Sequence, residues 1–232
     1  MFDITKLALK IPNFLTHEEC DGLINEFEQR KNESSLETSL DYNTNQHKQS
    51  SFEVVSLVPQ TNNFILIKEK TKIAIDSYLN YLDQPKYFFT HLLKQNLRFS
   101  HSYRIMKYEE GASIHPHSDH DTGTYASISF NLNENYEGGE FKFFNGKYTI
   151  PLKKGDALIF PADYFWVHEV TPVTKNSRYS INSFILRFPH QITMDSVMIA
   201  DNLTNHRLHT KPIEEFLGPY NNSFSEVVKR KK

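Results

Sequence analysis

Cysteine is nearly absent from this chain of 232 residues, which carries a single thiol at Cys20. One cysteine cannot form an internal disulfide framework or a cysteine-based zinc site. Long apolar runs are missing too. No stretch approaches the roughly 20 apolar residues that span a bilayer, and the opening MFDITKLALKIPNF holds no apolar run of signal-peptide length. These absences predict a soluble protein of the reducing cytoplasm that has no membrane partner.

An excess of one charge is also lacking, because 26 Lys and Arg face 28 Asp and Glu for a net charge of −2. This balance argues against strong sequence-independent binding of nucleic acid. Aromatic residues are plentiful, and the 18 Phe and 12 Tyr predict an aromatic core. The chain contains no internal repeat and no low-complexity linker, so we expect a single domain over residues 1–232. Nothing in the sequence indicates an oligomeric state.

The first part of the chain has a mixed pattern. Thr16 is followed three residues later by Glu19, which is the spacing of a capping box and predicts a helix that runs to about Arg30. Apolar residues near helical spacing predict a second helix over about 60–82. The stretch 32–51 is rich in Ser, Thr, Asn and Gln, and we expect a mobile loop or irregular strands there.

The second part of the chain changes to a period of two. Within 125–133, apolar residues alternate with Ser and Asn, which predicts a strand with one apolar and one polar face. The dipeptide Asn145-Gly146 predicts a two-residue hairpin turn. Further strands are expected over 157–160 and 178–187. A polar strand face that points inward would suit a ligand-binding barrel.

Many short strands with tight turns predict a mainly β protein with flanking helices, built as a sandwich or jelly roll. We expect a helical and extended support region over 1–96, a β core over 97–190 and a C-terminal extension over 191–232.

One histidine and one carboxylate stand two residues apart, at His117 and Asp119, and another histidine follows at His168. Residues two apart on a strand face the same way, so the first pair could aim at one ion. Two histidines and a carboxylate can hold Fe(II) by one triangular face. Three coordination positions then stay open for a bidentate cosubstrate and O₂. The pattern predicts a non-haem iron centre.

This stretch also offers competing ligands. His115 stands two residues before His117, which is the same spacing, and both His120 and Asp121 could bind metal. His168 taken alone could be a hydrogen-bonded core histidine. Residue types and spacing by themselves do not choose among these alternatives.

A series of short motifs follows in order between residues 103 and 187. They are Tyr108-Glu109-Glu110-Gly111, His117-Ser118-Asp119, Leu132-Asn133, Gly138-Gly139-Glu140, Gly155-Asp156-Ala157-Leu158-Ile159-Phe160, His168-Glu169-Val170-Thr171-Pro172-Val173 and Arg178. In this order they resemble the core of the prolyl 4-hydroxylase-like branch of the iron(II)- and 2-oxoglutarate-dependent dioxygenases. The resemblance implies a double-stranded β-helix core with an N-terminal helical layer, and it selects His117, Asp119 and His168 as the metal ligands.

A cosubstrate pocket is expected around Arg178, ten residues after His168, since its planar fork of donors suits a carboxylate. Ser180 lies on the same strand face. By resemblance, Tyr108 is the pocket tyrosine whose hydroxyl bonds the cosubstrate. Asn131 stands where several relatives have a second pocket tyrosine, so that contact is changed or lost. The implied cofactors are Fe(II), 2-oxoglutarate as cosubstrate and O₂, with ascorbate as a further candidate.

The resemblance implies conversion of 2-oxoglutarate to succinate and CO₂, coupled to hydroxylation of a substrate. Asp119 favours hydroxylation, because halogenating relatives lack this carboxylate. A prolyl residue in a protein or peptide is the leading substrate. The alternatives are a free amino acid or other small metabolite and, in a different class, a non-catalytic metal-binding barrel that acts as a sensor or scaffold.

Overall fold

The computed structural model describes residues 3–41, 46–84, 89–120 and 124–187, with the backbone alone for 38–41, 46–51 and 101. The expected C-terminal extension, 191–232, lies outside these residues, and the division of the chain into 1–96 and 97–190 stays a prediction. None of the helices in the described ranges combines the length and apolar character needed to cross a membrane.

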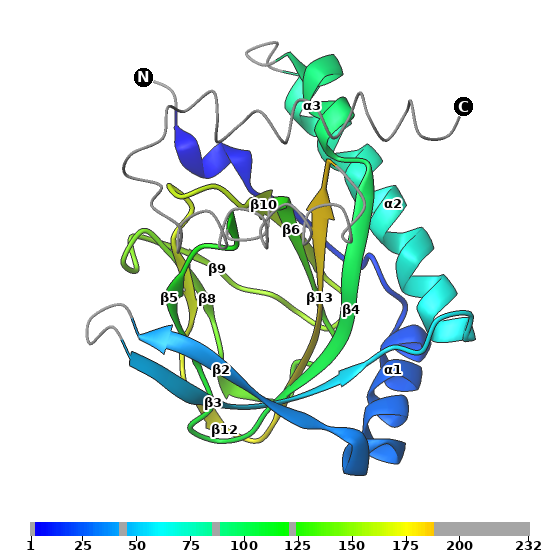
Figure 1. The fold of residues 1–232 in the computed structure, drawn as a ribbon, viewed down its shortest axis with the longest axis vertical. Coiled ribbons are helices and arrows are strands. Elements are labelled where there is room, and N and C mark those ends of the chain that lie inside the picture. The colour runs from blue at the N-terminus through cyan, green and yellow to red at the C-terminus, as the bar shows by residue number, and fades with distance from the viewer. Residues whose placement is uncertain (1–2, 42–45, 85–88, 121–123, 188–232) are drawn as a thin grey trace, which may run out of the picture. The chain divides into compact units, whose positions relative to one another are not determined.

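The helices α1 (His17–Gln29) and α2 (Asn62–Asp83) flank one side of the large sheet (Figure 1). The other helices of the described residues are η1 (Ile4–Leu7), η2 (Lys31–Glu33) and α3 (Thr90–Asn96). The predicted capping box is present, because Thr16 accepts from the Glu19 amide while the Glu19 carboxylate accepts from the Thr16 amide. Both predicted helices are confirmed, whereas α3 was not predicted. It has 7 residues and no side-chain cap, too little for a periodic signal.

The strands form two main sheets and a small one. The large sheet has the order β1-β10-β6-β13-β4-β3-β2, the second β5-β11-β8-β9 and the small one β12-β7. The bounds are β1 Leu9–Ile11, β2 Ser35–Asp41, β3 Gln46–Ser56, β4 Phe99–Tyr108, β5 Ile114–His117, β6 Thr124–Asn131, β7 Glu137–Gly138, β8 Phe141–Phe143, β9 Tyr148–Ile150, β10 Ala157–Pro161, β11 His168–Val170, β12 Val173–Lys175 and β13 Arg178–Leu186. The sheets face one another as a double-stranded β-helix with flanking helices, which is the fold expected (Figure 1).

The alternation predicted for 125–133 places apolar and polar side chains on opposite faces of β6, as expected. Ile128 and Phe130 of β6 join a core between the large sheet and the helices, to which Phe27 of α1 also belongs. Ser129 and Asn131 point from the same strand into the space between the sheets, where Asn131 meets the side chain of Arg178. A second core also lies there, and it includes the aromatic residues Phe52, Tyr108, Phe141, Phe143, Phe160 and Trp166.

The hairpin at Asn145-Gly146 differs from the prediction. Phe143 pairs with Tyr148, so the connection has four residues (144–147) and not two. Phe144 leaves the ladder because its ring packs on Trp166, with 5.1 Å between centroids, and its amide donates to Val167. Phe144, Asn145 and Gly146 all take positive φ, which a glycine and an asparagine tolerate well.

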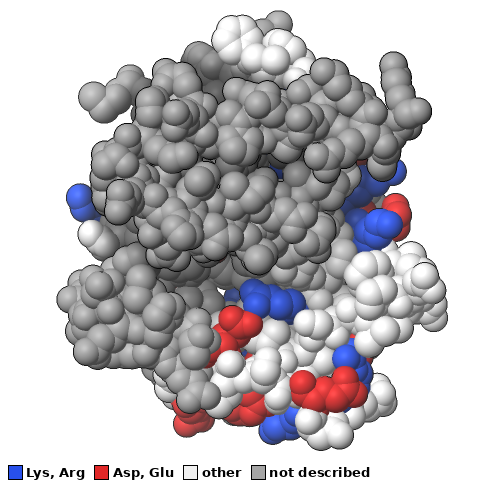
Figure 2. Space-filling view, in the orientation of Figure 1, with Lys and Arg blue, Asp and Glu red and all other residues white. Residues whose placement is uncertain are grey.

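The polar stretch 32–51 contains strands, which was one of the two expected alternatives. β2 and β3 pair antiparallel, and β3 continues the large sheet by pairing with β4. Backbone hydrogen bonds between β2 and β3, and those from residues 52–56 of β3 to β4, supply the order that the side-chain pattern does not indicate. On the face shown in Figure 2, acidic and basic side chains of the described residues are interspersed and form no large area of one sign.

Candidate active site

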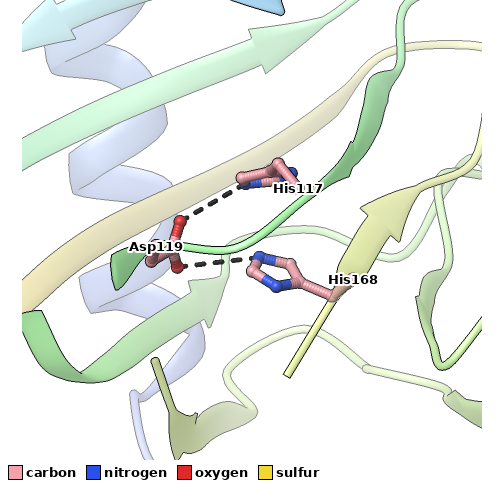
Figure 3. Close-up of side chains that lie close together, drawn as sticks. All are labelled: His117, Asp119 and His168. Carbon is pink, nitrogen blue, oxygen red and sulfur yellow. Dashed lines mark ion pairs between the residues drawn. The ribbon is translucent and has the colours of Figure 1, made fainter. Parts of the chain in front are cut away.

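Two neighbouring strands of the smaller main sheet bring the histidines together. His117 ends β5 and His168 begins β11, where the two residues pair directly with 4.3 Å between ring centroids. Asp119 lies in the bend after β5, with its Oδ1 3.3 Å from His117 Nε2 and its Oδ2 3.6 Å from His168 Nε2 (Figure 3). The expectation that strand alternation aims both His117 and Asp119 is therefore wrong. The bend after the strand turns the carboxylate toward the imidazoles.

Hydrogen bonds hold each of the three groups in orientation. Nδ1 of His117 lies 2.8 Å from the His115 carbonyl, and Nδ1 of His168 lies 3.0 Å from the Trp166 carbonyl. Because a carbonyl only accepts, each Nδ1 carries a proton and each Nε2 is turned toward Asp119. The Ser127 hydroxyl donates to Asp119 Oδ2 at 2.5 Å.

The protonation states suit a divalent cation. Burial lowers the pKa of His168 to about 4, so this imidazole is neutral at pH 7. Burial would raise the pKa of Asp119, but His168, His117 and the Ser127 hydroxyl outweigh it and hold that pKa below its ordinary value. An ionised carboxylate and neutral imidazoles are the forms that bind metal. These side chains fit an iron ion of the 2-His-1-carboxylate type.

His115 and His120 do not join the group of His117, Asp119 and His168. Among the residues that the structure describes, the donor atoms of His117, Asp119 and His168 converge to within 4.8 Å. His120 instead packs its ring on Tyr164, with 4.1 Å between centroids. His115 contributes its carbonyl, and Asp121 lies outside the described residues.

Arg178 lies deep between the sheets, with 0% of its surface exposed. It begins β13 opposite Tyr108, and its guanidinium carbon lies 5.0 Å from the Tyr108 ring centroid and 5.4 Å from that of Phe141. Nε donates to Asn131 Oδ1 at 3.2 Å. Within the described part of the chain, Nη1 and Nη2 are buried without a hydrogen-bond partner. Since a buried charge needs a partner, the pocket fits a carboxylate ligand.

The lack of a side chain at Gly139 makes room for this arginine. Gly139 has φ +61°, and a Cβ there would stand 2.8 Å from Arg178 Cδ. The glycine of the Gly-Gly-Glu motif thus lets the arginine stem lie against the chain.

A row of buried polar side chains continues from Arg178 along the inner face of the large sheet. Ser180 pairs with Asn131, and Asn182 pairs with Ser129 in the next step of the ladder. Ser180 Oγ, Ser129 Oγ and Asn182 Oδ1 are buried without a hydrogen-bond partner in the described ranges. Ser127, which stands two residues before Ser129 on β6, donates a hydrogen bond from its hydroxyl to Asp119. The row therefore joins the arginine pocket to the group formed by His117, Asp119 and His168.

Of the predicted pocket residues, Arg178, Ser180, Asn131 and Tyr108 all lie in this inner region. Burial raises the pKa of the Tyr108 phenol, so the hydroxyl stays protonated as a donor. The sequence interpretation missed Tyr136, whose hydroxyl donates to Asn131 Oδ1 at 3.1 Å. Its position two residues before the Gly-Gly-Glu motif was the available signal.

Comparison with known proteins agrees with this geometry. The sequence model of the 2OG-Fe(II) oxygenase superfamily matches residues 103–186. A multifunctional procollagen lysine hydroxylase and glycosyltransferase from Caenorhabditis elegans is 33% identical over 123 residues, which are 51% of this chain and 14% of that protein. A PKHD-type hydroxylase from Cupriavidus pinatubonensis is 27% identical over 106 residues, which are 44% of this chain and 46% of that protein. The chain thus spans less than half the length of these relatives.

Solved structures share the fold. A Pseudomonas putida prolyl-4-hydroxylase superposes with a TM-score of 0.56 at 20% identity, covering 79% of this chain and 94% of that one. A Trichoplax adhaerens prolyl hydroxylase in complex with a hypoxia inducible factor peptide fragment gives a TM-score of 0.58 at 16% identity, covering 79% and 84%. Residues 103–186 thus match the 2OG-Fe(II) oxygenase superfamily, and the fold around them is similar to that of these prolyl hydroxylases.

Proposed function

We propose that this protein is an Fe(II)- and 2-oxoglutarate-dependent hydroxylase in which His117, Asp119 and His168 hold the iron and Arg178 binds the far carboxylate of 2-oxoglutarate. The observation that carries the proposal is the buried guanidinium, whose Nη1 and Nη2 face no hydrogen-bond partner in the described chain. A dicarboxylate would pair with Arg178 at one end and reach the metal-binding group along the polar row at the other.

Bound iron and 2-oxoglutarate would supply the oxidative decarboxylation that places one oxygen atom in succinate and the other in the substrate. The protein's own groups bind and orient. Each histidine presents Nε2 because its Nδ1 proton is engaged by a carbonyl, and Ser127 keeps the Asp119 carboxylate turned toward them. Arg178 neutralises the cosubstrate charge, and aromatic residues such as Phe141 exclude water around it.

The proposed substrate is a prolyl residue within a polypeptide. Tyr164 and Phe165 are 70% and 76% exposed on the connection between β10 and β11, and the Tyr164 ring lies against His120 beside the metal-binding group. Exposed aromatic side chains there suit the apolar surface of a peptide segment. The peptide complex of the Trichoplax enzyme and the procollagen lysine hydroxylase relative support a polypeptide over a free amino acid.

Release of succinate from 2-oxoglutarate without substrate tests the catalytic proposal. We expect it to require Fe(II) and to disappear in His117→Ala and in His168→Ala. His115→Ala is the matched control from the same strand and should retain turnover. Activity that survives in His117→Ala but is lost in His115→Ala would refute the metal assignment. If Fe(II) binds but no succinate forms, the chain is a non-catalytic metal-binding barrel.

Mass spectrometry of peptide libraries and metabolite pools tests the substrate. We expect peptides to gain one oxygen atom on proline in the presence of Fe(II) and 2-oxoglutarate. Oxygen on lysine, or on a small metabolite while every proline-containing pool stays unchanged, would overturn the prolyl assignment and leave the oxygenase in place. A need for ascorbate and a cytoplasmic location stay predictions from the sequence.

A further inference from the structure

Asn131 stands at a junction of hydrogen bonds beside Arg178. Its Oδ1 accepts from Arg178 Nε at 3.2 Å and from the Tyr136 hydroxyl at 3.1 Å. Its Nδ2 donates to the carbonyls of Asn133, at 2.6 Å, and Lys153, at 3.4 Å. A side-chain amide has two acceptor sites and two donor hydrogens, so all four are engaged. Asn131 therefore has no free position with which to contact a cosubstrate directly.

The same bonds determine how Arg178 presents its charge. The guanidinium is planar, so an acceptor on Nε sets the plane and direction of Nη1 and Nη2. A cavity of about 240 Å³ is lined by Arg178 together with Glu134, Tyr136 and Glu140. A loosely held guanidinium could turn toward these carboxylates. The bond from Tyr136 fixes Asn131, and Asn131 in turn fixes the arginine.

We propose that Asn131 and Tyr136 are positioning residues that hold Arg178 by its Nε, so that Nη1 and Nη2 remain for the cosubstrate carboxylate. The inference rests on the proposed function, because it assigns these residues to the binding of 2-oxoglutarate. It also changes the role expected for Asn131 from the sequence, since this residue acts through Arg178.

Tyr136→Phe is the primary test, because it removes one hydroxyl and keeps the ring. We expect KM for 2-oxoglutarate to rise roughly three- to tenfold, as the loss of one hydrogen bond implies, with kcat retained at saturating 2-oxoglutarate. Tyr148→Phe is the matched control, since Tyr148 lies on β9 outside this network, and it should change neither quantity. A lowered kcat with unchanged KM in Tyr136→Phe would overturn the proposal.

A double-mutant cycle shows whether Tyr136 acts through Arg178. We expect Arg178→Ala to raise KM for 2-oxoglutarate. In the combined variant, Tyr136→Phe should cause no further rise in KM. Calorimetric binding of glutarate to the metal-free protein should follow the same pattern, which gives a readout apart from turnover. Additive effects would overturn the positioning role while leaving the arginine pocket intact. If Arg178→Ala alters neither KM nor glutarate binding, the carboxylate pocket of the proposed function fails, and the positioning role fails with it.

Discussion

The central strands β4, β6 and β13 have two faces of opposite character. The face toward the helices carries packed apolar side chains, which include Ile105, Ile128, Phe130, Ile181 and Ile185. The inner face carries buried polar groups without hydrogen-bond partners in the described ranges, at Ser180, Ser129, Asn182 and the Nη1 and Nη2 atoms of Arg178, whereas β13 has one such group, Ser183, on the helix-facing side. Unpaired buried polar groups destabilise a fold unless something binds them. The comparison indicates that one face supplies stability and the other is kept for a ligand.

The largest effect on stability should come from the helix-facing side. Phe27 of α1 is fully buried and its ring lies against Tyr179 of β13, with 5.8 Å between centroids. We expect Phe27→Ala to lower the free energy of unfolding by about 3–5 kcal/mol, measured by urea denaturation. KM for 2-oxoglutarate of the folded fraction should not change. A rise in KM would show that the two faces are coupled.

On the inner face, Arg178→Ala should have the largest effect on cosubstrate binding. Loss of a charge-assisted contact in a dry pocket is expected to raise KM for 2-oxoglutarate by roughly tenfold or more, in steady-state kinetics. Arg178→Lys should lose less, because the charge stays while the planar fork is lost. Equal cosubstrate affinity in the wild type and the Ala variant would contradict the assignment.

A serine pair on β13 gives a sharper comparison. Ser180 and Ser183 are both fully buried with unpartnered hydroxyls within the described chain, and they lie on opposite faces of the strand. We expect Ser180→Ala to raise KM for 2-oxoglutarate roughly two- to tenfold, since it removes a donor from the polar row. Ser183→Ala should leave KM unchanged. Equal kinetic effects of both changes would mean that the inner face is not the binding face.

The smallest effect concerns the thiol of Cys20, which belongs to the helix-facing core. Burial raises the pKa of Cys20 to about 11, so the native thiol stays protonated at pH 8. Because the folded pKa exceeds the unfolded one, this group's contribution to stability is present at neutral pH and is lost as the pH rises. We expect slow alkylation by iodoacetamide at pH 8 in the native protein and fast alkylation in denaturant. Rapid native alkylation would show that this core opens.

Prediction from sequence succeeded where the signal was local. The capping box of Thr16 and Glu19 gave the start of α1, and the alternation around Ile128 gave the two-faced strand β6. Prediction from sequence failed where contacts between residues distant in the chain determine the local conformation. Phe144 leaves its hairpin because Trp166 offers a packing surface.

The order of the motifs and the residue types in them are properties of the sequence, and they sufficed to predict the class of fold and the three candidate ligands. Their convergence is a tertiary property, because His117 and His168 meet only where β5 pairs with β11, and Asp119 turns toward them in a bend that no local pattern indicates. The bonds from Tyr136 and Arg178 to Asn131 likewise join separate segments. Hydrogen bonds between distant residues depend on how the sheets pack, so only the folded chain decides which polar groups are satisfied and which are left for a ligand.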